Sequence, residues 1–441
     1  MIKEDARDKA WRQGRRKGVS LRRCLKTLTG ILLCVSMAGC GAGTASDTIS
    51  DVSNGASNTQ ANEEVSAPKT KTLKEYTAEY HSDMYPVEGY AQEIEDSIAQ
   101  VQTLTYDDSV SYIFITDTHL GNAGNSSPEE SAEAIYHQLY AAVDVANHSD
   151  VDFICVGGDI QDGYCMGETK KQQAIDYIQS VSDILKLSEK PVFIVKGNHD
   201  DNSQTGEIDP SILYDPEYVI TKDEWYQATM ANFPQYATDY HDGYYYYDLP
   251  GKNVRVVCLN MVDIDDSVVD GKRIEIGRAD YGYKDEQLEW LMNSAFSRPD
   301  CEYVILSHDG FKDSSRAYTN REHLQALLKA AYTHTPFSTD KFSMDFTDWT
   351  GKIKIYQCGH MHHERVAQYE ELGGLPVVTT DSSVALEYEQ SPMPWAKDYT
   401  REQNRSVGTI REALFDITIL NDDVYDFVRF GAGDNRQLIV K

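Results

Sequence analysis

Short apolar runs alternate with longer amphipathic segments along the chain from Tyr112 onward. The first three runs, each followed by a segment of helical periodicity, span 112–116, 152–158 and 191–197. Strands that alternate with helices in this way predict βαβ units and a largely parallel sheet. Later runs have hairpin spacing, because only a short polar turn at 421–423 separates the last two. The sequence therefore predicts an α/β fold with mixed sheets.

Side chains that commonly bind metals stand directly after five of these runs. Because the carboxyl ends of strands gather at one edge of an open α/β sheet, we expect side chains far apart in the sequence to meet there. On an extended backbone alternate residues point to the same side, so each pair spaced by two is expected to face one pocket. His363 is expected to lie against the surface or behind the ligands. The candidate ligands are Asp117, His119, Asp159, Asn198, His308, His360 and His362.

The candidate ligands combine imidazoles with carboxylate and amide oxygens, and they include no thiolate. Such a mixture suits Mn, Fe, Zn or Ni, and it differs from a closed structural zinc site. Seven ligands are too many for one ion. We therefore expect two divalent metal ions that share a carboxylate, an arrangement that clamps the attacking and leaving oxygens of a phosphoryl transfer.

As an ordered set, the motifs D-x-H, G-D-x-x-D, G-N-H-D, a single histidine after a strand and G-H-x-H resemble the calcineurin-like metallophosphoesterase family. The resemblance covers residues 112 to about 380. It implies a calcineurin-like layered sandwich of two mixed β-sheets flanked by helices. It also implies hydrolysis of a phosphomonoester or phosphodiester by a hydroxide that bridges two metal ions. By this resemblance one ion is held by Asp117, His119 and His362, the other by Asn198, His308 and His360, and Asp159 bridges them.

The same resemblance implies catalytic roles for two further residues. His199 would stabilise the transferring group or protonate the leaving oxygen, and Asp162 would orient it. Two departures from the family bear on the substrate. Gly163 stands where Ser/Thr protein phosphatases carry a phosphate-binding arginine, which disfavours a protein phosphatase. Asp309 follows His308 in place of the frequent second histidine.

Other functions are compatible with parts of the sequence. A catalytically inactive surface-binding lipoprotein on the same fold is disfavoured by the complete ligand set, and a zinc peptidase by the absence of an HExxH motif. Within the enzyme class, a nucleotide or cyclic-nucleotide phosphodiesterase is an alternative. The chain has 71 acidic and 41 basic residues, and this charge repels nucleic-acid polymers. The expected partner is a small phosphoester, and no protein partner is predicted.

The first 72 residues indicate export and a tether. Basic residues from 12 to 26 precede a short apolar stretch at 30–38, and Gly39 stands directly before Cys40. The stretch is shorter than the ~20 residues of a spanning helix, and this order resembles a lipoprotein signal peptide. We therefore predict lipidation of Cys40 and anchoring to the extracytoplasmic face of the cell membrane, with secretion as the alternative. The predicted parts are a signal peptide over 1–39, a disordered linker over 40–72 and a metallophosphoesterase domain with C-terminal strands over 73–441.

Two segments fit the regular pattern poorly, and a third precedes the first strand. Residues 73–105 are expected to form a partly helical lead-in, and 262–283 and 311–348 are long, apart from a helical pattern at 321–332. Long loops in a compact domain commonly belong to a site. The last two segments carry arginines that either bind phosphate or are solvated: Arg273, Arg278 and Arg316.

Overall fold

The computed structural model describes residues 87–122, 126–311, 318–385 and 399–441. The chain divides into two compact units, 1–68 and 69–441, and the described residues all belong to the second. Within the described ranges, no helix has both the length and the apolarity needed to cross a bilayer. Some predictions lie outside the described residues: the signal peptide over 1–39, Cys40, the linker over 40–72, residues 73–86 of the expected lead-in and Arg316.

The first sheet contains six strands in the order β19-β18-β17-β1-β2-β3. β1 pairs with β2 and β2 with β3 in parallel, whereas β17, β18 and β19 extend the sheet in antiparallel pairs. The parallel connections pass through α4 (Pro128–His148) and α5 (Gln172–Leu185), which gives the predicted βαβ units. The strands are β1 (Val110–Ile115), β2 (Phe153–Val156), β3 (Val192–Ile194), β17 (Leu414–Leu420), β18 (Val424–Gly431) and β19 (Arg436–Ile439).

The second sheet contains seven strands in the order β15-β16-β14-β10-β6-β5-β4. Its centre, formed by β6, β10, β14 and β16, is parallel, and antiparallel strands flank it on both sides. The strands are β4 (Thr238–His241), β5 (Tyr244–Asp248), β6 (Val254–Cys258), β10 (Glu302–Leu306), β14 (Ile353–Cys358), β15 (Arg365–Tyr369) and β16 (Leu375–Thr379).

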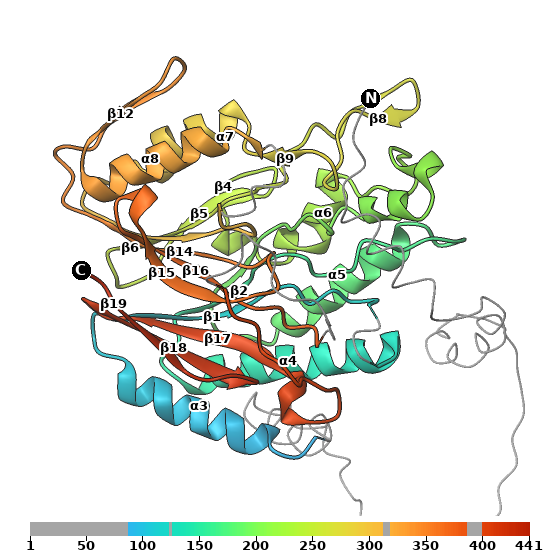
Figure 1. The fold of residues 1–441 in the computed structure, drawn as a ribbon, viewed down its shortest axis with the longest axis horizontal. Coiled ribbons are helices and arrows are strands. Elements are labelled where there is room, and N and C mark those ends of the chain that lie inside the picture. The colour runs from blue at the N-terminus through green and yellow to red at the C-terminus, as the bar shows by residue number, and fades with distance from the viewer. Residues whose placement is uncertain (1–86, 123–125, 312–317, 386–398) are drawn as a thin grey trace, which may run out of the picture. The chain divides into compact units, whose positions relative to one another are not determined.

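Helices cover the outer face of each sheet (Figure 1). The helices α3 (Tyr90–Leu104), α4 and α5 lie along the first sheet, and α7 (Asp285–Trp290) and α8 (Arg321–Thr333) lie along the second. Every residue of β1, β2 and β14 is buried. Strands buried on both faces are mostly apolar in sequence, which explains the runs. The predicted layered α/β sandwich with two mixed sheets is confirmed.

Alternate residues of β10 serve two apolar cores. Val304 and Leu306 pack into the core that the first sheet also fills. Tyr303 and Ile305 point to the other face and join the core under α7 and α8. This alternation places the second sheet directly between the first sheet and its own covering helices.

Some elements differ from the sequence prediction. The helix expected at 285–296 divides into α7 and a π-helical turn (Leu291–Ala295), and the one expected at 223–232 ends early as α6 (Lys222–Ala228). β4, β15 and β19 are additional strands, since short strands with many polar residues give little periodic signal. The two long segments also hold short strands: β7 (Val268–Val269), β8 (Lys272–Arg273), β9 (Tyr281–Gly282), β11 (Tyr318–Thr319), β12 (Pro336–Ser338) and β13 (Ser343–Asp345).

Candidate metal centre

The candidate ligands follow the carboxyl ends of five strands, and both sheets contribute. The turns after β1, β2 and β3 supply residues from the first sheet, and the turns after β10 and β14 supply residues from the second. In chain order these turns carry Asp117 and His119, Asp159, Asn198, His308, and His360 with His362.

Five of the seven candidate ligands stand on left-handed backbone, which differs from the extended backbone expected from the sequence. The φ angles are 53° at Asp117, 44° at His119, 52° at Asp159, 69° at His360 and 49° at His362. Residues other than glycine rarely adopt this region, and such strain concentrates at functional sites. The two-residue repeat of a strand therefore does not bring these side chains together. Turns directly after each strand end do so instead.

Two glycines let these turns approach one another closely. A Cβ atom at Gly197 would lie 2.2 Å from the main-chain nitrogen of Asp159. A Cβ atom at Gly359 would lie 2.1 Å from Oγ1 of Thr116. Real Cβ atoms do not come this close to other atoms, so both positions require glycine. Each glycine directly precedes a candidate ligand in the sequence, and this position is the sequence feature that indicates a close approach of the turns.

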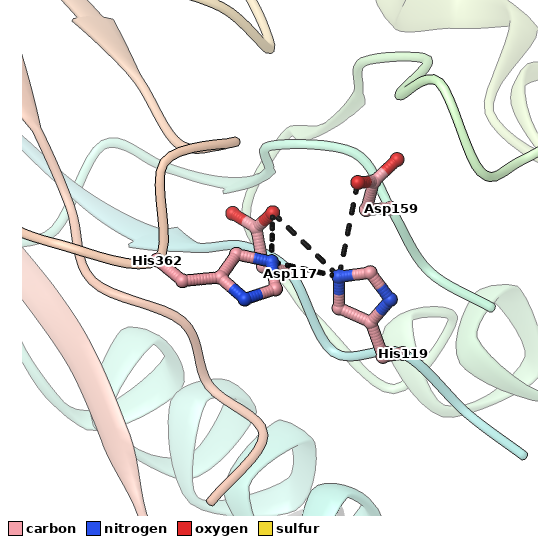
Figure 2. Close-up of side chains that lie close together, drawn as sticks. All are labelled: Asp117, His119, Asp159 and His362. Atoms are coloured by element: carbon pink, nitrogen blue, oxygen red, sulfur yellow. Dashed lines mark hydrogen bonds and ion pairs between the residues drawn. The ribbon is translucent and has the colours of Figure 1, made fainter. Parts of the chain in front are cut away.

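Four side chains form a first ligand group, which consists of Asp117, His119, Asp159 and His362 (Figure 2). One potential ligand atom from each lies within 4.8 Å of the others. The Nε2 atoms of His119 and His362 are 2.9 Å apart, and Nε2 of His362 lies 3.2 Å from Oδ1 of Asp117. Nε2 of His119 lies 3.7 Å from Oδ2 of Asp159. The ligand atoms thus converge on one point.

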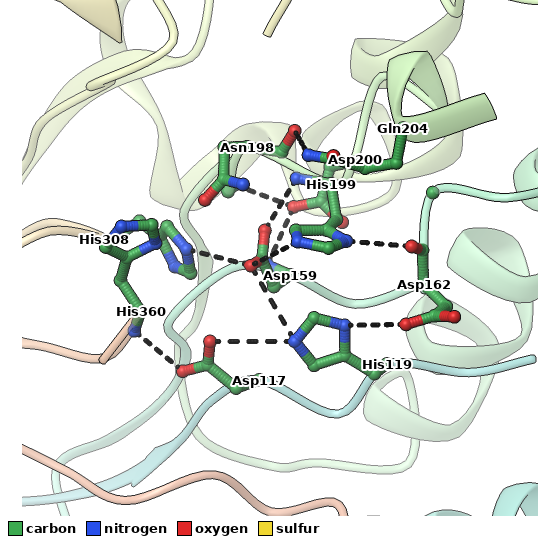
Figure 3. Close-up of polar contacts among 12 residues, drawn as sticks. Asp117, His119, Asp159, Asp162, Asn198, His199, Asp200, Gln204, His308 and His360 are labelled. Atoms are coloured by element: carbon green, nitrogen blue, oxygen red, sulfur yellow. Dashed lines mark hydrogen bonds and ion pairs between the residues drawn. The ribbon is translucent and has the colours of Figure 1, made fainter. Parts of the chain in front are cut away.

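Three side chains form a second ligand group, which consists of Asp159, His308 and His360. Nε2 of His308 lies 3.1 Å from Oδ2 of Asp159, and the two imidazole rings have centroids 5.0 Å apart. Figure 3 shows the buried Asn198 beside Asp159. Asp159 belongs to both ligand groups, so its carboxylate stands between two sets of imidazoles.

Three buried ligand atoms make no hydrogen bond of good geometry within the described part of the chain: Oδ1 of Asp117, Oδ1 of Asn198 and Nε2 of His308. The first and the last have an ionisable neighbour, at 3.2 and 3.1 Å. An unpaired buried polar atom costs about 1–3 kcal/mol. A cation would satisfy all three, and a donor set of imidazole, carboxylate and amide oxygen suits a divalent transition metal. The residues therefore fit a metal-binding role.

The charges in the site influence one another strongly. Burial alone would lower the pKa of His308, yet the carboxylate of Asp159 raises it to about 10. Burial alone would raise the pKa of Asp159, yet the imidazoles of His308 and His199 hold it well below its usual range. Burial lowers the pKa of His362 to about 4. Because metal ligands are ionised carboxylates and neutral imidazoles, Asp159 and His362 already have the form that binds a cation.

Asp162 contacts His199 through its main chain, and its carboxylate faces a candidate ligand instead. Nδ1 of His199 lies 2.7 Å from the carbonyl oxygen of Asp162. Because a carbonyl only accepts, Nδ1 carries the proton, and Nε2 faces Asp159 at 3.9 Å. Oδ1 of Asp162 lies 3.3 Å from Nδ1 of His119 and accepts a hydrogen bond from Asn122. The carboxylate thus faces His119, and the contact of Asp162 with His199 that the resemblance implied is made by the main-chain carbonyl.

Asp200, to which the sequence analysis gave no role, connects two of the ligand turns. Its carboxylate accepts main-chain N–H bonds from Asp159 at 3.0 Å, from Ile160 at 2.7 Å and from Gly197 at 2.7 Å. Burial, with the neighbouring carboxylate of Asp159, raises the pKa of Asp200 to about 7. In the sequence, Asp200 is visible only as the last residue of the motif G-N-H-D. Its contact with the turn that carries Asp159 is evident only from the tertiary structure.

The arginines of the long segments have different environments. Arg273 is buried and donates to two main-chain carbonyls, so it holds the chain together and faces no ligand group. Arg278 donates to Gln204 at 2.9 Å and to Glu207, next to the turn that carries Asn198. The sequence alone did not distinguish these two arginines.

A sandwich of two mixed sheets, with carboxylates and imidazoles converging at the strand ends, defines an α/β protein with a candidate metal centre. Residues 110–364, more than half of the chain, match the family described as Calcineurin-like phosphoesterase. The protein belongs to the calcineurin-like phosphoesterase family, as its motifs predicted.

Among solved structures, a dimetal phosphatase from Danio rerio is 15% identical and has a TM-score of 0.47, covering 75% of this chain and 99% of that one. GAP50, the anchor in the inner membrane complex of Plasmodium, is 13% identical with a TM-score of 0.38, covering 76% of this chain and 90% of that one. Both TM-scores lie below 0.5, so the family assignment rests on the family match. No curated protein matches the chain.

Proposed function

We propose that the protein hydrolyses a small phosphomonoester or phosphodiester with two divalent metal ions, one at each ligand group. The supporting observation is the position of Asp159, which belongs to both groups. A carboxylate shared by two imidazole-bearing groups is suited to bridge two ions. Family membership supports the reaction class, and the donor set supports Mn, Fe, Zn or Ni.

Each ligand group has a defined task in this proposal. Asp117, His119 and His362 would hold one ion, Asn198, His308 and His360 would hold the other, and Asp159 would offer its carboxylate to both. Bound ions supply Lewis acidity to the phosphoryl group and lower the pKa of water toward neutrality, which provides a nucleophile.

The remaining polar residues position groups around the ions. The carboxylate of Asp162 keeps the proton of His119 on Nδ1, so that Nε2 points into the first ligand group. The carbonyl of Asp162 holds Nδ1 of His199 and leaves Nε2 on the side of Asp159. When the imidazole of His199 is protonated, Nε2 is the atom that donates to the transferring group or passes a proton to the leaving oxygen.

Hydrolysis of p-nitrophenyl phosphate and bis-p-nitrophenyl phosphate with added Mn²⁺ tests this function. We expect the parent to cleave at least one ester and Asp159→Asn to lose activity, because the bridge then lacks its charge. Asp176→Asn, at an exposed position on α5 where the side chain accepts a bond from Gln172, is the control and should match the parent. A metal-loaded parent that cleaves neither ester would support a binding module that has lost catalysis.

We also propose that the protein is exported and held by a lipid on Cys40. The order of basic residues, a short apolar stretch and Gly39 before Cys40 supports this. Expression in a bacterial host, followed by detergent phase partition, provides the test. The parent should enter the detergent phase and Cys40→Ser the aqueous phase. An equal distribution of the two would contradict the anchor.

A further inference from the structure

A second polar group lies beside His199, and none of the ligand groups includes it. This polar wall consists of Tyr164, Glu207 and Arg278. The hydroxyl of Tyr164 donates to Oε2 of Glu207 at 2.7 Å, and Arg278 donates to Oε1 of the same carboxylate. The ring of Tyr164 meets the imidazole of His199 edge-on, with centroids 6.3 Å apart. The polar wall thus adjoins the residue proposed to act on the leaving oxygen.

The segment that carries Arg278 is fixed to the turn after β3. The main-chain nitrogen of Gly277 donates to Oδ2 of Asp201 at 2.6 Å. The main-chain nitrogen of Arg278 donates to Oγ of Ser203 at 2.9 Å. Ser203 begins the 3₁₀ helix η1 (Ser203–Glu207), which ends at the carboxylate of the polar wall. The part of the segment 262–283 around Arg278 therefore packs against the turn after β3.

Gln204 links the polar wall to the metal centre. Its Nε2 donates to the carbonyl of Asn198 at 3.3 Å (Figure 3). Its Oε1 accepts from Arg278 at 2.9 Å. It also fills the space beside Gly163, where an added Cβ would lie 2.6 Å from Cγ of Gln204. A side chain at position 163, such as an arginine, has no room. The polar wall beside His199 therefore has no arginine from position 163, and it contains the carboxylate of Glu207.

The carboxylate of Glu207 is able to accept further hydrogen bonds. Its side chain is 21% exposed, as is that of His199, so each side chain is partly open to solvent. A carboxylate has about four acceptor positions, two on each oxygen. Tyr164 and Arg278 each use one, on different oxygens, and they hold the group in one orientation. Two hydroxyl groups on neighbouring carbons have the spacing to donate one bond to each oxygen.

We propose that Glu207, held by Tyr164 and Arg278, is a specificity-determining residue that recognises a leaving alcohol with two neighbouring hydroxyl groups. This inference rests on the proposed phosphoester hydrolysis and names its substrate class. Glycerol, sugars and the ribose of a nucleoside share this chemistry. A leaving group with its own negative charge is repelled by Glu207 and disfavoured.

The test compares the glycerol ester with the 1-propyl ester of phosphate, each as the monoester and as the methyl diester, in the presence of Mn²⁺. These alcohols differ only in the two hydroxyl groups. We expect kcat/KM of the parent to favour the glycerol ester by about 10- to 100-fold, the effect of hydrogen bonds to a charged group. In Glu207→Gln this ratio should fall toward one. Tyr164→Phe, which removes the hydroxyl that donates to Glu207, should lower the ratio by less.

Glu217→Gln is the matched control, since Glu217 pairs with Lys170 at an exposed position in the same stretch of chain. Its ratio should equal that of the parent. Equal losses on both esters in Glu207→Gln would mean that Glu207 only supports the fold, and that would overturn the proposal. A parent that cleaves both esters without preference would also overturn the proposal on Glu207, but the proposed phosphoester hydrolysis would stand. A parent that cleaves neither ester contradicts the proposed function itself.

Adenosine 5′-phosphate and its 2′,3′-dideoxy analogue, tested as mono- and methyl diesters, distinguish the two sources of the hydroxyl pair. For each pair, the ratio is kcat/KM of the ester with the two hydroxyl groups divided by kcat/KM of the ester without them. If the ratio of the parent is larger for the adenosine pair than for the glycerol pair, the site is assigned to ribonucleosides. A smaller ratio assigns it to small polyols. In either case Glu207→Gln must lower the larger ratio, and a ratio that does not change contradicts the assignment.

Discussion

Replacing Asp162 by alanine is expected to weaken metal binding while His199 stays in place. The carboxylate lies 3.3 Å from Nδ1 of His119, opposite the Nε2 atom that faces the first ligand group. Removing such a partner behind a ligating histidine lowers metal affinity about 10- to 100-fold, or about 1.4–2.7 kcal/mol. The hydrogen bond to His199 survives, because it comes from the main-chain carbonyl of residue 162.

Calorimetric titration of the metal-free protein with Mn²⁺ measures this effect. We expect one of the two Mn²⁺ dissociation constants, that of the first ligand group, to rise by the stated factor in Asp162→Ala, and activity to recover as Mn²⁺ is raised. Asp176→Ala, at an exposed position on α5, should titrate like the parent. An Asp162→Ala protein with the Mn²⁺ affinity of the parent and a reduced kcat at saturating Mn²⁺ would refute the reasoning. The carboxylate would then serve His199.

Two further predictions concern stability. Asp416 is fully buried between Arg429, at 2.9 Å, and Arg436. Burial alone would raise the pKa of Asp416, but the two guanidinium groups hold it below its usual value. This stabilisation is present above about pH 4 and is lost as pH falls through the lower folded pKa. In urea unfolding, Asp416→Asn should therefore lose about 3–5 kcal/mol of unfolding free energy at pH 7. The unfolding free energy of this variant should also decline less toward pH 3 than that of the parent. A variant whose unfolding free energy follows that of the parent at every pH would contradict this prediction. Calorimetry should show that Gly163→Ala destabilises more than Gly167→Ala, since both have positive φ but Gly167 has no neighbour within 4 Å; equal shifts would exclude the close contact at Gly163.

The strands and the convergence of ligands at their ends follow from local patterns in the sequence. A buried strand needs a continuous apolar run, and the turn after it is the place where polar ligands and glycines are tolerated. His360 and His362 illustrate this, because they follow β14 directly and fall into different ligand groups. Their separation into two groups was expected from the family resemblance. The extended backbone that the spacing indicated is absent, and both residues adopt left-handed φ angles.

Roles set by tertiary contacts had no counterpart in the sequence pattern. Asp162 occupies a motif position, but the motif does not tell whether its carbonyl or its carboxylate faces His199. Arg273 and Arg278 stand five residues apart in one long segment, yet one is buried against main-chain carbonyls and the other lies beside the metal centre. The direction of a side chain in an irregular segment depends on which distant turn the segment packs against. That packing is determined only by the complete fold.

The shared position of Asp159 is tested most directly by a crystal structure of the protein grown with Mn²⁺, with anomalous diffraction recorded at the manganese edge. Two anomalous peaks about 3.5–4 Å apart are expected, each within about 2.0–2.2 Å of an oxygen of Asp159. A single peak, or two peaks of which one has no contact with Asp159, would contradict the two-ion centre.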